Sequence, residues 1–432
     1  MTVRKLTATV AAPGVPFFTP AQDPPVGTAL NTDNDNGAGS KTPTVFTPLK
    51  LRSLTLQNRF AVSPMCMYSA DDGHLTDFHL VHLGAMAMRG VALTIFEATS
   101  VTPNGRISPE DSGLWTDSQI APLKRIVDFI HSQGQKAGIQ LAHAGRKAST
   151  VAPWHTQNRG QGETATAAQG GWPDNVWAPS AIKFSPKFPQ PKEMTVSDIE
   201  GLVDSFAKAA SRAVSAGFDT IEIHAAHGYL FTEFLSPITN KRTDQYGGSF
   251  ENRTRLLVDV IKATRAVIPE TMPLLVRISA TEWMEWTGEE SWDLAQSIRL
   301  AKLLPDLGVD LLDVSSAGNN AEQRMQITPT VQIDLAGEIR DAVRAAGKTL
   351  LIGAVGFVNT AEIARRIVQT GDEGLVDVDG EHGQKTKADL VLVARQFLKE
   401  PEFVLRAAHQ LGVEVKWPLQ YGRAAWAKGE KL

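Results

Sequence analysis

Two histidines and a tyrosine stand within six positions of one another in the segment IEIHAAHGYL, at His224, His227 and Tyr229. Before them, Ile221 and Ile223 alternate with polar residues, as in a β-strand with two different faces. Side chains of these types can bind a metal ion, move a proton, or form a hydrogen-bonded pair without a chemical role. The segment alone leaves these three explanations open.

The chain has a single cysteine, Cys66. One thiol excludes an intrachain disulfide, an iron–sulfur cluster held by several thiolates and a multi-cysteine zinc site. We therefore expect a reducing, cytoplasmic setting. A lone cysteine in an apolar strand is most often an inert small hydrophobic residue, so Cys66 by itself indicates no site.

The composition is that of a globular protein with ample material for a core, because 42% of the residues are hydrophobic and 21% are charged. A net charge of -4 without a long basic run argues against a nucleic-acid or anionic-membrane partner. No run approaches the roughly 18 apolar residues that cross a bilayer. Residues 1–43 are rich in Pro, Thr, Gly and Asn and lack the apolar stretch of a signal peptide. We expect them to form an extended or disordered arm before a single domain at 44–432.

The elements that must position these residues follow a repeating pattern of short apolar runs and helical segments. The runs lie at 59–65, 93–99, 136–143, 220–227, 274–280, 311–318, 349–356 and 390–396, and the helical candidates at 119–133, 197–216, 251–267, 291–304, 332–346 and 360–369. Strands that alternate with helices predict parallel βαβ units, and eight strands close an α/β (β/α)8 TIM barrel. An open doubly wound sheet is the alternative, although no G-x-G-x-x-G follows the first strand.

Polar side chains collect where these runs end. They are Cys66, Gln140, His143, His224, His227, Arg277, Ser315, Ser316 and Arg395. A (β/α)8 barrel builds its active site at the C-terminal ends of its strands, so we expect these residues to converge there. The connection at 144–195 is long enough to act as a lid. The insertion at 371–388 is typical of a surface loop.

Several motifs, taken in order, resemble the old yellow enzyme family over roughly residues 44–426. They are SPMCMYS (63–69), IQLAHAGRKA (139–148), HAAHGYL (224–230), NKRTDQYGGSFENRTR (240–255) and VRIS (276–279). Cys66 and the C-terminal QYGRAAW resemble the thermophilic-like subgroup of that family. The resemblance implies an ene-reductase on a (β/α)8 barrel with tightly bound, non-covalent FMN. NADPH or NADH reduces the flavin, which then reduces the activated C=C bond of a small-molecule alkene.

The resemblance also implies roles for the residues of the opening segment. His224 and His227 match the pair that binds the carbonyl or nitro oxygen of the substrate, and Tyr229 matches the proton donor to its α-carbon. Two ring N–H groups aimed at an oxygen that gains negative charge form an oxyanion hole. A phenol keeps its proton at neutral pH and can release it to a developing carbanion. No metal is implied.

Further substrate contacts are expected from three residues. Tyr68 matches a tyrosine of the substrate pocket, and Arg423 matches an arginine that reaches into the active site of a neighbouring subunit. The protein would then be a dimer or a larger homo-oligomer, although a tail packed on its own subunit is the alternative. Trp286, after the fifth strand, adds aromatic bulk that would narrow the pocket.

Flavin binding needs hydrogen-bond partners for the pyrimidine edge, a cation beside the reduced ring and an anchor for the phosphate. The resemblance assigns ring contacts to Ser63, Pro64, Met65, Cys66 and Ala98, the pyrimidine to Gln140, the reduced ring to Arg277 and the phosphate region to Gly353, Gly356, Ala394 and Arg395. Ala394 and Ala317 stand where the family commonly has glycine, and their methyl groups crowd backbone that is expected to approach the phosphate closely.

Rival functions need residues that the sequence lacks. A dienoyl-CoA reductase needs a cysteine cluster, and a Schiff-base aldolase needs a lysine at a strand end. A protein that only binds flavin has no need of the two histidines and the tyrosine. A flavin reductase whose main acceptor is a quinone or nitro compound stays open as the alternative function.

Overall fold

Eight parallel strands form a closed barrel in the computed structural model, which describes residues 8–30, 42–156, 162–369, 386–427 and 430. In order around the ring they are β3 (Phe60–Val62), β4 (Leu93–Ser100), β5 (Lys136–Ala142), β8 (Thr220–Ala225), β9 (Leu274–Ser279), β10 (Leu311–Ser315), β11 (Leu351–Val355) and β12 (Leu390–Val393). The last strand, β12, pairs in parallel with the first, β3, and so closes the barrel. The predicted (β/α)8 fold is confirmed.

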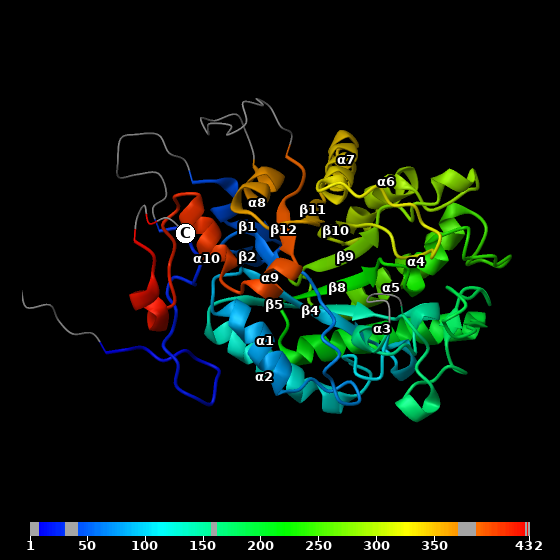
Figure 1. Ribbon diagram of the computed structural model, residues 1–432, viewed down its shortest axis with the longest axis horizontal. Helices are drawn as coiled ribbons and strands as arrows, with labels where there is room; N and C mark the ends of the chain where they lie inside the picture. The colour runs from blue at the N-terminus through cyan, green and yellow to red at the C-terminus, as the bar shows by residue number, and fades with distance from the viewer. Residues whose placement is uncertain (1–7, 31–41, 157–161, 370–385, 428–429, 431–432) are drawn as a thin grey trace, which may run out of the picture.

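Helices surround the barrel, as Figure 1 shows. They are α1 (Asp77–Ala87), α2 (Ile120–Ser132), α3 (Val196–Ala216), α4 (Leu230–Leu235), α5 (Phe250–Val267), α6 (Leu294–Leu303), α7 (Val331–Ala345), α8 (Ala361–Val368), α9 (Arg395–Lys399) and α10 (Phe403–Gln410). Outside the barrel, β1 (Leu49–Leu51) pairs with β2 (Leu54–Leu56), and β6 (Trp177–Ala178) pairs with β7 (Lys192–Glu193). In the part of the chain that the structure describes, every helix is too short or too polar to cross a membrane.

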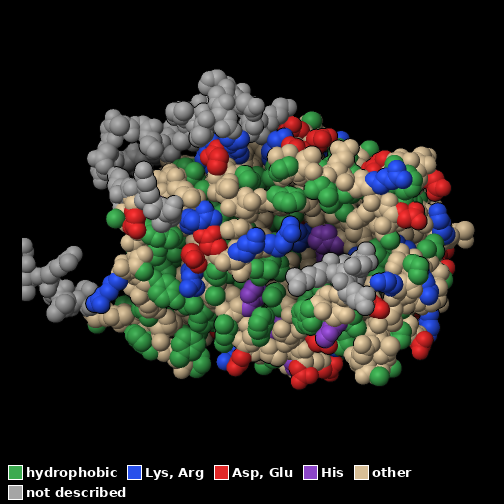
Figure 2. All heavy atoms as spheres, in the orientation of Figure 1, with side chains coloured by type: hydrophobic (Ala, Val, Ile, Leu, Met, Phe, Trp, Pro, Cys, Tyr) green, Lys and Arg blue, Asp and Glu red, His purple; other side chains and the backbone are tan. Residues whose placement is uncertain are grey.

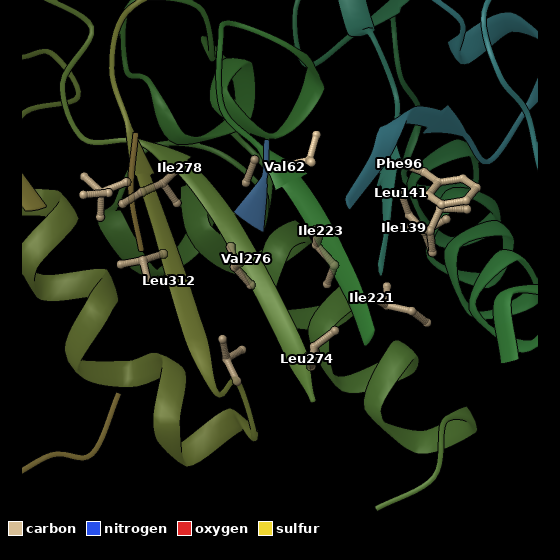
Figure 3. Close-up of a cluster of buried hydrophobic side chains, with 14 of the residues drawn as sticks. Val62, Phe96, Ile139, Leu141, Ile221, Ile223, Leu274, Val276, Ile278 and Leu312 are labelled. Carbon is tan, nitrogen blue, oxygen red and sulfur yellow. The ribbon is translucent and has the colours of Figure 1, made fainter. Parts of the chain in front are cut away.

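The period of two along each strand divides the barrel into an outer and an inner layer. The outward side chains are apolar and pack against the helices in one large core (Figure 3); they include Val62, Ile139, Leu141, Ile221, Ile223, Leu274, Val276, Ile278 and Leu312. The alternate positions on β8 and β9 carry Glu222, His224 and Arg277, which are buried inside the barrel. The strands therefore hold polar groups in the barrel interior while their other face supplies the apolar packing.

A second apolar cluster closes the N-terminal end of the barrel. Leucines of the β1–β2 hairpin pack there against side chains from the starts of the strands, such as Leu93, Leu275, Leu311 and Leu390. All four of these strand residues are fully buried. This end of the barrel is therefore solid packing, and the polar groups lie toward the other end.

Part of the N-terminal arm runs beside the C-terminal tail. The Gly27 N–H donates to the Lys416 carbonyl at 2.9 Å, and the Leu30 N–H donates to the Glu414 carbonyl at 2.9 Å. The arm's remaining residues, 1–7 and 31–41, and nearly all of the predicted 371–388 loop lie outside the described residues.

Candidate active site

The two histidines and the tyrosine of the opening segment come together at the C-terminal end of β8. The ring centroids of His224 and His227 are 5.2 Å apart, as are those of His224 and Tyr229. His227 has a φ of +61°, which turns the chain sharply, and Tyr229 then caps the start of α4. Two hydrogen bonds hold the His227 turn: its N–H donates to Ser279 Oγ at 2.8 Å, and its Nε2 lies 2.8 Å from Ser315 Oγ.

Glycine is required at the next position of this turn. Gly228 has a φ of +70°, and a Cβ added there would lie 2.0 Å from the carbonyl oxygen of Gly318. The loop after β10 thus presses directly against the loop after β8. The alternation that predicted a strand through residue 227 ends at Ala225 for this reason, because the chain must leave the strand to bring His227 and Tyr229 beside His224.

The protonation states of these groups follow from their burial. Burial lowers the pKa of both His224 and His227 well below its usual value, and the charge of Arg277 lowers it further. Both rings are neutral at neutral pH and each carries one N–H. Burial raises the pKa of Tyr229, so the phenol keeps its proton. His224 Nδ1 is buried without a hydrogen-bond partner in the described structure, which leaves it available to a ligand.

Among the described residues, no group of three or more His, Cys, Asp and Glu side chains is arranged to hold a metal ion.

Lys147 was not predicted as a site residue, yet it lies beneath this turn. Its Nζ donates to the carbonyl oxygens of His227 at 2.7 Å and Gly318 at 3.0 Å, and lies 4.8 Å from the centre of the Tyr229 ring. Burial, with a smaller contribution from Arg146, lowers the pKa of Lys147 to about 8. Its position in the IQLAHAGRKA motif was the only sequence signal.

Four polar side chains of neighbouring strands lie in the barrel interior next to His224. Gln140 Nε2 donates to Glu222 Oε1 at 2.7 Å, and Arg277 Nε lies 3.1 Å from Asp313 Oδ2 without forming a hydrogen bond. Burial raises the pKa of Glu222 to about 8 and that of Asp313 to about 6. Sequence reasoning found Gln140 and Arg277 but missed the two acids, although each alternates with apolar residues on its strand.

A cavity of about 340 Å³ opens beside Arg277, between the ends of β10, β11 and β12. Its lining includes four of the predicted flavin contacts, which are Arg277, Gly356, Ala394 and Arg395. Figure 2 shows basic and histidine side chains meeting in a hollow at the centre of this face. Gly353 lies within β11, where a Cβ would stand 2.6 Å from Leu392 Cδ1. Its contact with the flavin stays a prediction.

The segment after β3 continues the wall of the mouth next to the end of β12. The Ser63 N–H donates to the carbonyl of Val393 on β12 at 2.9 Å, and Pro64, Met65 and Cys66 follow, all half-buried. Tyr68 has a φ of +50° and meets the ring of Trp154 edge-on at 5.6 Å. Burial is the main cause that raises the pKa of the Cys66 thiol.

On the neighbouring strand, a bulge between Phe96 and Ala98 sets Ala98 beside Gln140. The bulged residue, Glu97, was missed by sequence reasoning. Its Oε1 accepts the Met67 N–H at 3.2 Å, and so fixes the segment that carries Cys66 and Tyr68.

The sequence of the chain between residues 44 and 414 matches the model of the NADH:flavin oxidoreductase / NADH oxidase family. The chain belongs to this family.

Individual relatives agree with this family. The chain is 48% identical to an NADH:flavin oxidoreductase of Gibberella zeae over 94% of its own length and 93% of the relative's. It is 39% identical to the NADPH dehydrogenase of Bacillus subtilis, covering 88% of this chain and 98% of that one. A solved structure of morphinone reductase in complex with tetrahydroNAD superposes with a TM-score of 0.64 at 27% identity, over 86% and 92% of the two chains. The protein is an FMN-dependent oxidoreductase of the old yellow enzyme type with a nicotinamide donor.

The groups at the mouth fit the FMN that this family binds. Arg277 offers a buried cation whose Nε has no hydrogen-bond partner in the described structure. Gln140 stands two strands away on β5, opposite Glu222 of β8. The cavity that begins at Arg277 ends among Arg395 and Lys399, two cations suited to a phosphate. Its donor set therefore matches the anionic ring edge and the phosphate of the flavin.

Two predicted substrate contacts of this flavin oxidoreductase lie on the surface. Trp286 is 44% exposed, and the guanidinium of Arg324 stacks on its ring at 3.6 Å. Arg423 is exposed on the 3-10 helix Leu419–Ala424, which contacts the N-terminal arm through Gln22 and Gln420. The reach of Arg423 into a second subunit stays a prediction.

Proposed function

We propose that this enzyme reduces the C=C bond of alkenes conjugated to a carbonyl or nitro group, with NAD(P)H as the electron source and ping-pong kinetics. The observation that carries the proposal is the cluster of two neutral histidines and a protonated tyrosine around one point of the mouth, beside the buried Arg277. The morphinone reductase similarity supports a reductase function. A quinone or a nitro compound as the main acceptor is the second candidate.

His224 and His227 would bind the carbonyl or nitro oxygen of the alkene. Because both rings are neutral, each offers an N–H without carrying a positive charge into the buried mouth. The oxygen gains negative charge as the β-carbon is reduced, and two fixed N–H donors stabilise that charge more than they stabilise the ground state. Lys147 keeps the His227 turn in place through the His227 carbonyl.

Tyr229 would supply the proton that the α-carbon needs. Its ring lies beside His224, so an alkene whose oxygen is held by the histidines presents its α-carbon near the phenol. The raised pKa keeps this proton on Tyr229 until a carbanion develops. The β-carbon receives a hydride and the α-carbon a proton, which together saturate the double bond.

FMN, when bound and reduced by NAD(P)H, supplies the hydride. Gln140 and Arg277 would hold the pyrimidine edge of its ring, and Arg395, with Gly356 and Ala394, its phosphate. The segment Ser63, Pro64, Met65 and Cys66, together with Ala98, would line the ring. Tyr68 would face the substrate; Trp286 would do so only from the rim, and Arg423 only from a second copy of the chain.

An anaerobic titration tests the proposal. NADPH, and NADH in parallel, should bleach the flavin absorbance at the visible maximum, and 2-cyclohexen-1-one should restore it. The double variant His224→Ala plus His227→Ala should keep its flavin and be bleached, but recover far more slowly. His131→Ala is the matched control, because His131 pairs with Asp219 at the opposite end of the barrel and should recover at the wild-type rate. Normal enone turnover by the double variant contradicts the proposal. Recovery with menadione but not with the enone favours the second candidate.

A further inference from the structure

A small cavity beside Tyr229 contains a buried acid that the proposed reaction does not use. The cavity measures about 10 Å³, close to the space that one water molecule occupies. Tyr229 and His224 line one side, and Asp111, on the loop after β4, lines the other. The rest of its wall comes mainly from small residues at the ends of β4 and β5, such as Ala98 and Ala142.

The carboxyl of Asp111 is built into its loop. It is 2% exposed, its Oδ1 accepts the Ser108 hydroxyl at 2.9 Å, and its Oδ2 accepts the Ile107 N–H at 2.8 Å. A carboxyl group has about four positions for hydrogen bonds. The Ser108 hydroxyl and the N–H groups of Ile107 and Ser108 occupy three of them, so one more bond can form. The position of this acid is therefore fixed while it can still bond to a water molecule.

Tyr229 has a need that this acid can meet. Each alkene reduced consumes the phenolic proton and leaves a buried phenolate, with the Lys147 ammonium 4.8 Å from the centre of its ring. It must regain a proton before the next alkene arrives. The cavity connects it with a group that can hold a proton and pass it on.

We propose that Asp111 returns a proton to Tyr229 after each turnover, through one water molecule held in this cavity. This inference rests on the proposed function. The proton leaves the carboxylic acid of Asp111, passes through the water to the phenolate oxygen, and is replaced on Asp111 from solvent. No electrons move in this step.

The charges around Asp111 are consistent with this role. Burial, and the negative charge of Glu97 on β4, raise the pKa of Asp111 to about 7, against the lowering effect of the Ser108 and Ile107 hydrogen bonds. Six titratable or charged groups face it: Cys66 and Tyr68 after β3, Glu97 on β4, Arg106 on its own loop, His224 on β8 and Tyr229 after it. The cavity wall from β5 and the residues that follow it contains only alanines. Near neutral pH the acid therefore exchanges its proton readily.

The test compares a first turnover with continuous turnover. Pre-reduced wild type and Asp111→Asn are mixed once with 2-cyclohexen-1-one, and both are also assayed at steady state with saturating NADPH and enone. The first turnover uses the proton already on Tyr229, so its rate should agree within about twofold between the two proteins. At steady state Asp111→Asn should be slower by about a hundredfold, the low end of general-acid effects. Its pre-steady-state trace should show a burst of one flavin oxidised.

The pH profile separates this role from a structural one. The steady-state rate of wild type should fall as the pH rises through about 7, where Asp111 loses its proton, while Asp111→Asn should show no such fall. Ser108→Ala is the matched control, because it removes one hydrogen bond to the carboxyl but keeps the acid. Its pre-steady-state trace should show no burst, as in wild type.

Each result decides the proposal. Equal steady-state rates and pH profiles in wild type and Asp111→Asn overturn the relay alone. An equal loss in first and later turnovers, shared by Ser108→Ala, shows a structural role and also overturns it. If Asp111→Asn does not fold with flavin, a wild-type steady-state rate without a fall near pH 7 still refutes the relay. A wild type that never reduces the enone refutes the proposed function, and the relay with it.

Discussion

Replacing Arg277 by methionine should separate its role in the fold from its role in binding flavin. Arg277 is 4% exposed and Asp313 is fully buried, with 3.1 Å between Nε and Oδ2. Glu222 lies on the other side, and its pKa is raised by burial and by the charge of Asp313 but lowered by Arg277. Arg277 is thus the cation that balances this buried group of acids.

Two different magnitudes follow from this arrangement. Removing one partner of a buried ion pair leaves the other charge uncompensated, which costs about 3–5 kcal/mol. Arg277→Met should therefore lower the free energy of unfolding of the flavin-free chain by that amount. Adding Asp313→Asn removes the uncompensated carboxylate charge and should recover most of the lost free energy of unfolding.

Flavin binding should respond differently. A hydrogen bond to a charged group contributes about 1.5–3 kcal/mol, so the Kd of FMN should rise by about 10- to 150-fold in Arg277→Met. The added Asp313→Asn change should not restore this affinity, because the cation is still missing.

Urea unfolding of the flavin-free proteins and FMN titration by fluorescence quenching measure the two quantities independently. The flavin must be absent from the unfolding experiment, since a bound ligand adds its own stabilisation. A double variant that binds FMN with the wild-type Kd would refute the placement of the flavin against Arg277. Unchanged stability in Arg277→Met would refute the balancing role.

Two substitutions and one pH profile test other parts of the site. Glu233, on α4, accepts the N–H of Arg146, the neighbour of Lys147, at 2.8 Å. Burial raises the pKa of Glu233 from 4.5 to about 8, so its contribution to stability is present below pH 4.5 and is lost as the pH rises to 8. Urea unfolding should show Glu233→Gln gaining stability relative to wild type over that range, and parallel pH curves would contradict this. His224 and His227 stay neutral between about pH 5.5 and 7.5, because their pKa values are lowered well below the usual histidine value of about 6.5. The first-turnover rate of pre-reduced enzyme with 2-cyclohexen-1-one, measured by stopped flow, should therefore not change over this range. A rate that titrates at about pH 6.5 would show the reasoning to be wrong. Ala317 has a φ of +71°, which strains a residue with a side chain. Ala317→Gly should relieve about 1–2 kcal/mol of strain and lose about 0.5–1 kcal/mol to the greater entropy of glycine in the unfolded chain, so the variant should be slightly more stable. A shift of the urea unfolding midpoint to lower concentration would contradict this gain.

The barrel could be predicted because its strands appear as apolar runs in the sequence, whereas four helices, α1, α4, α9 and α10, were not among the predicted segments. The helix α1, DFHLVHLGAMA, carries apolar residues on its exposed as well as its buried side: Val81 is 73% exposed, whereas Met86 is buried. The strand predicted at 390–396 ends at Val393, because Arg395 already begins α9. Apolar runs do not reveal where a strand turns into the loop that shapes the mouth.

The predicted site residues on β8 and its loop follow from local sequence, but their supporting groups do not. Lys147 reaches the His227 carbonyl, and Glu97 the Met67 N–H, across long stretches of chain. Asp111 meets Tyr229 only across a cavity between two loops. Such contacts depend on how loops pack over the finished barrel, which a single sequence does not encode as a pattern.

The pairing of β12 with β3 has a consequence for how the molecule is assembled. It joins the first and last strands of the barrel, and bringing such distant segments together carries the largest loop-closure entropy in the ring. A chain with so many long-range pairings is expected to fold slowly. The β12–β3 pairing, called the seam below, should be among the last contacts to form.

The proposed flavin site borders that seam, because Ala394 and Arg395 follow β12 while Ser63 follows β3. A cofactor that contacts the residues after both strands would stabilise the β12–β3 pairing. Hydrogen exchange in the flavin-free chain should therefore be fastest, among the barrel strands, at β12 and β3.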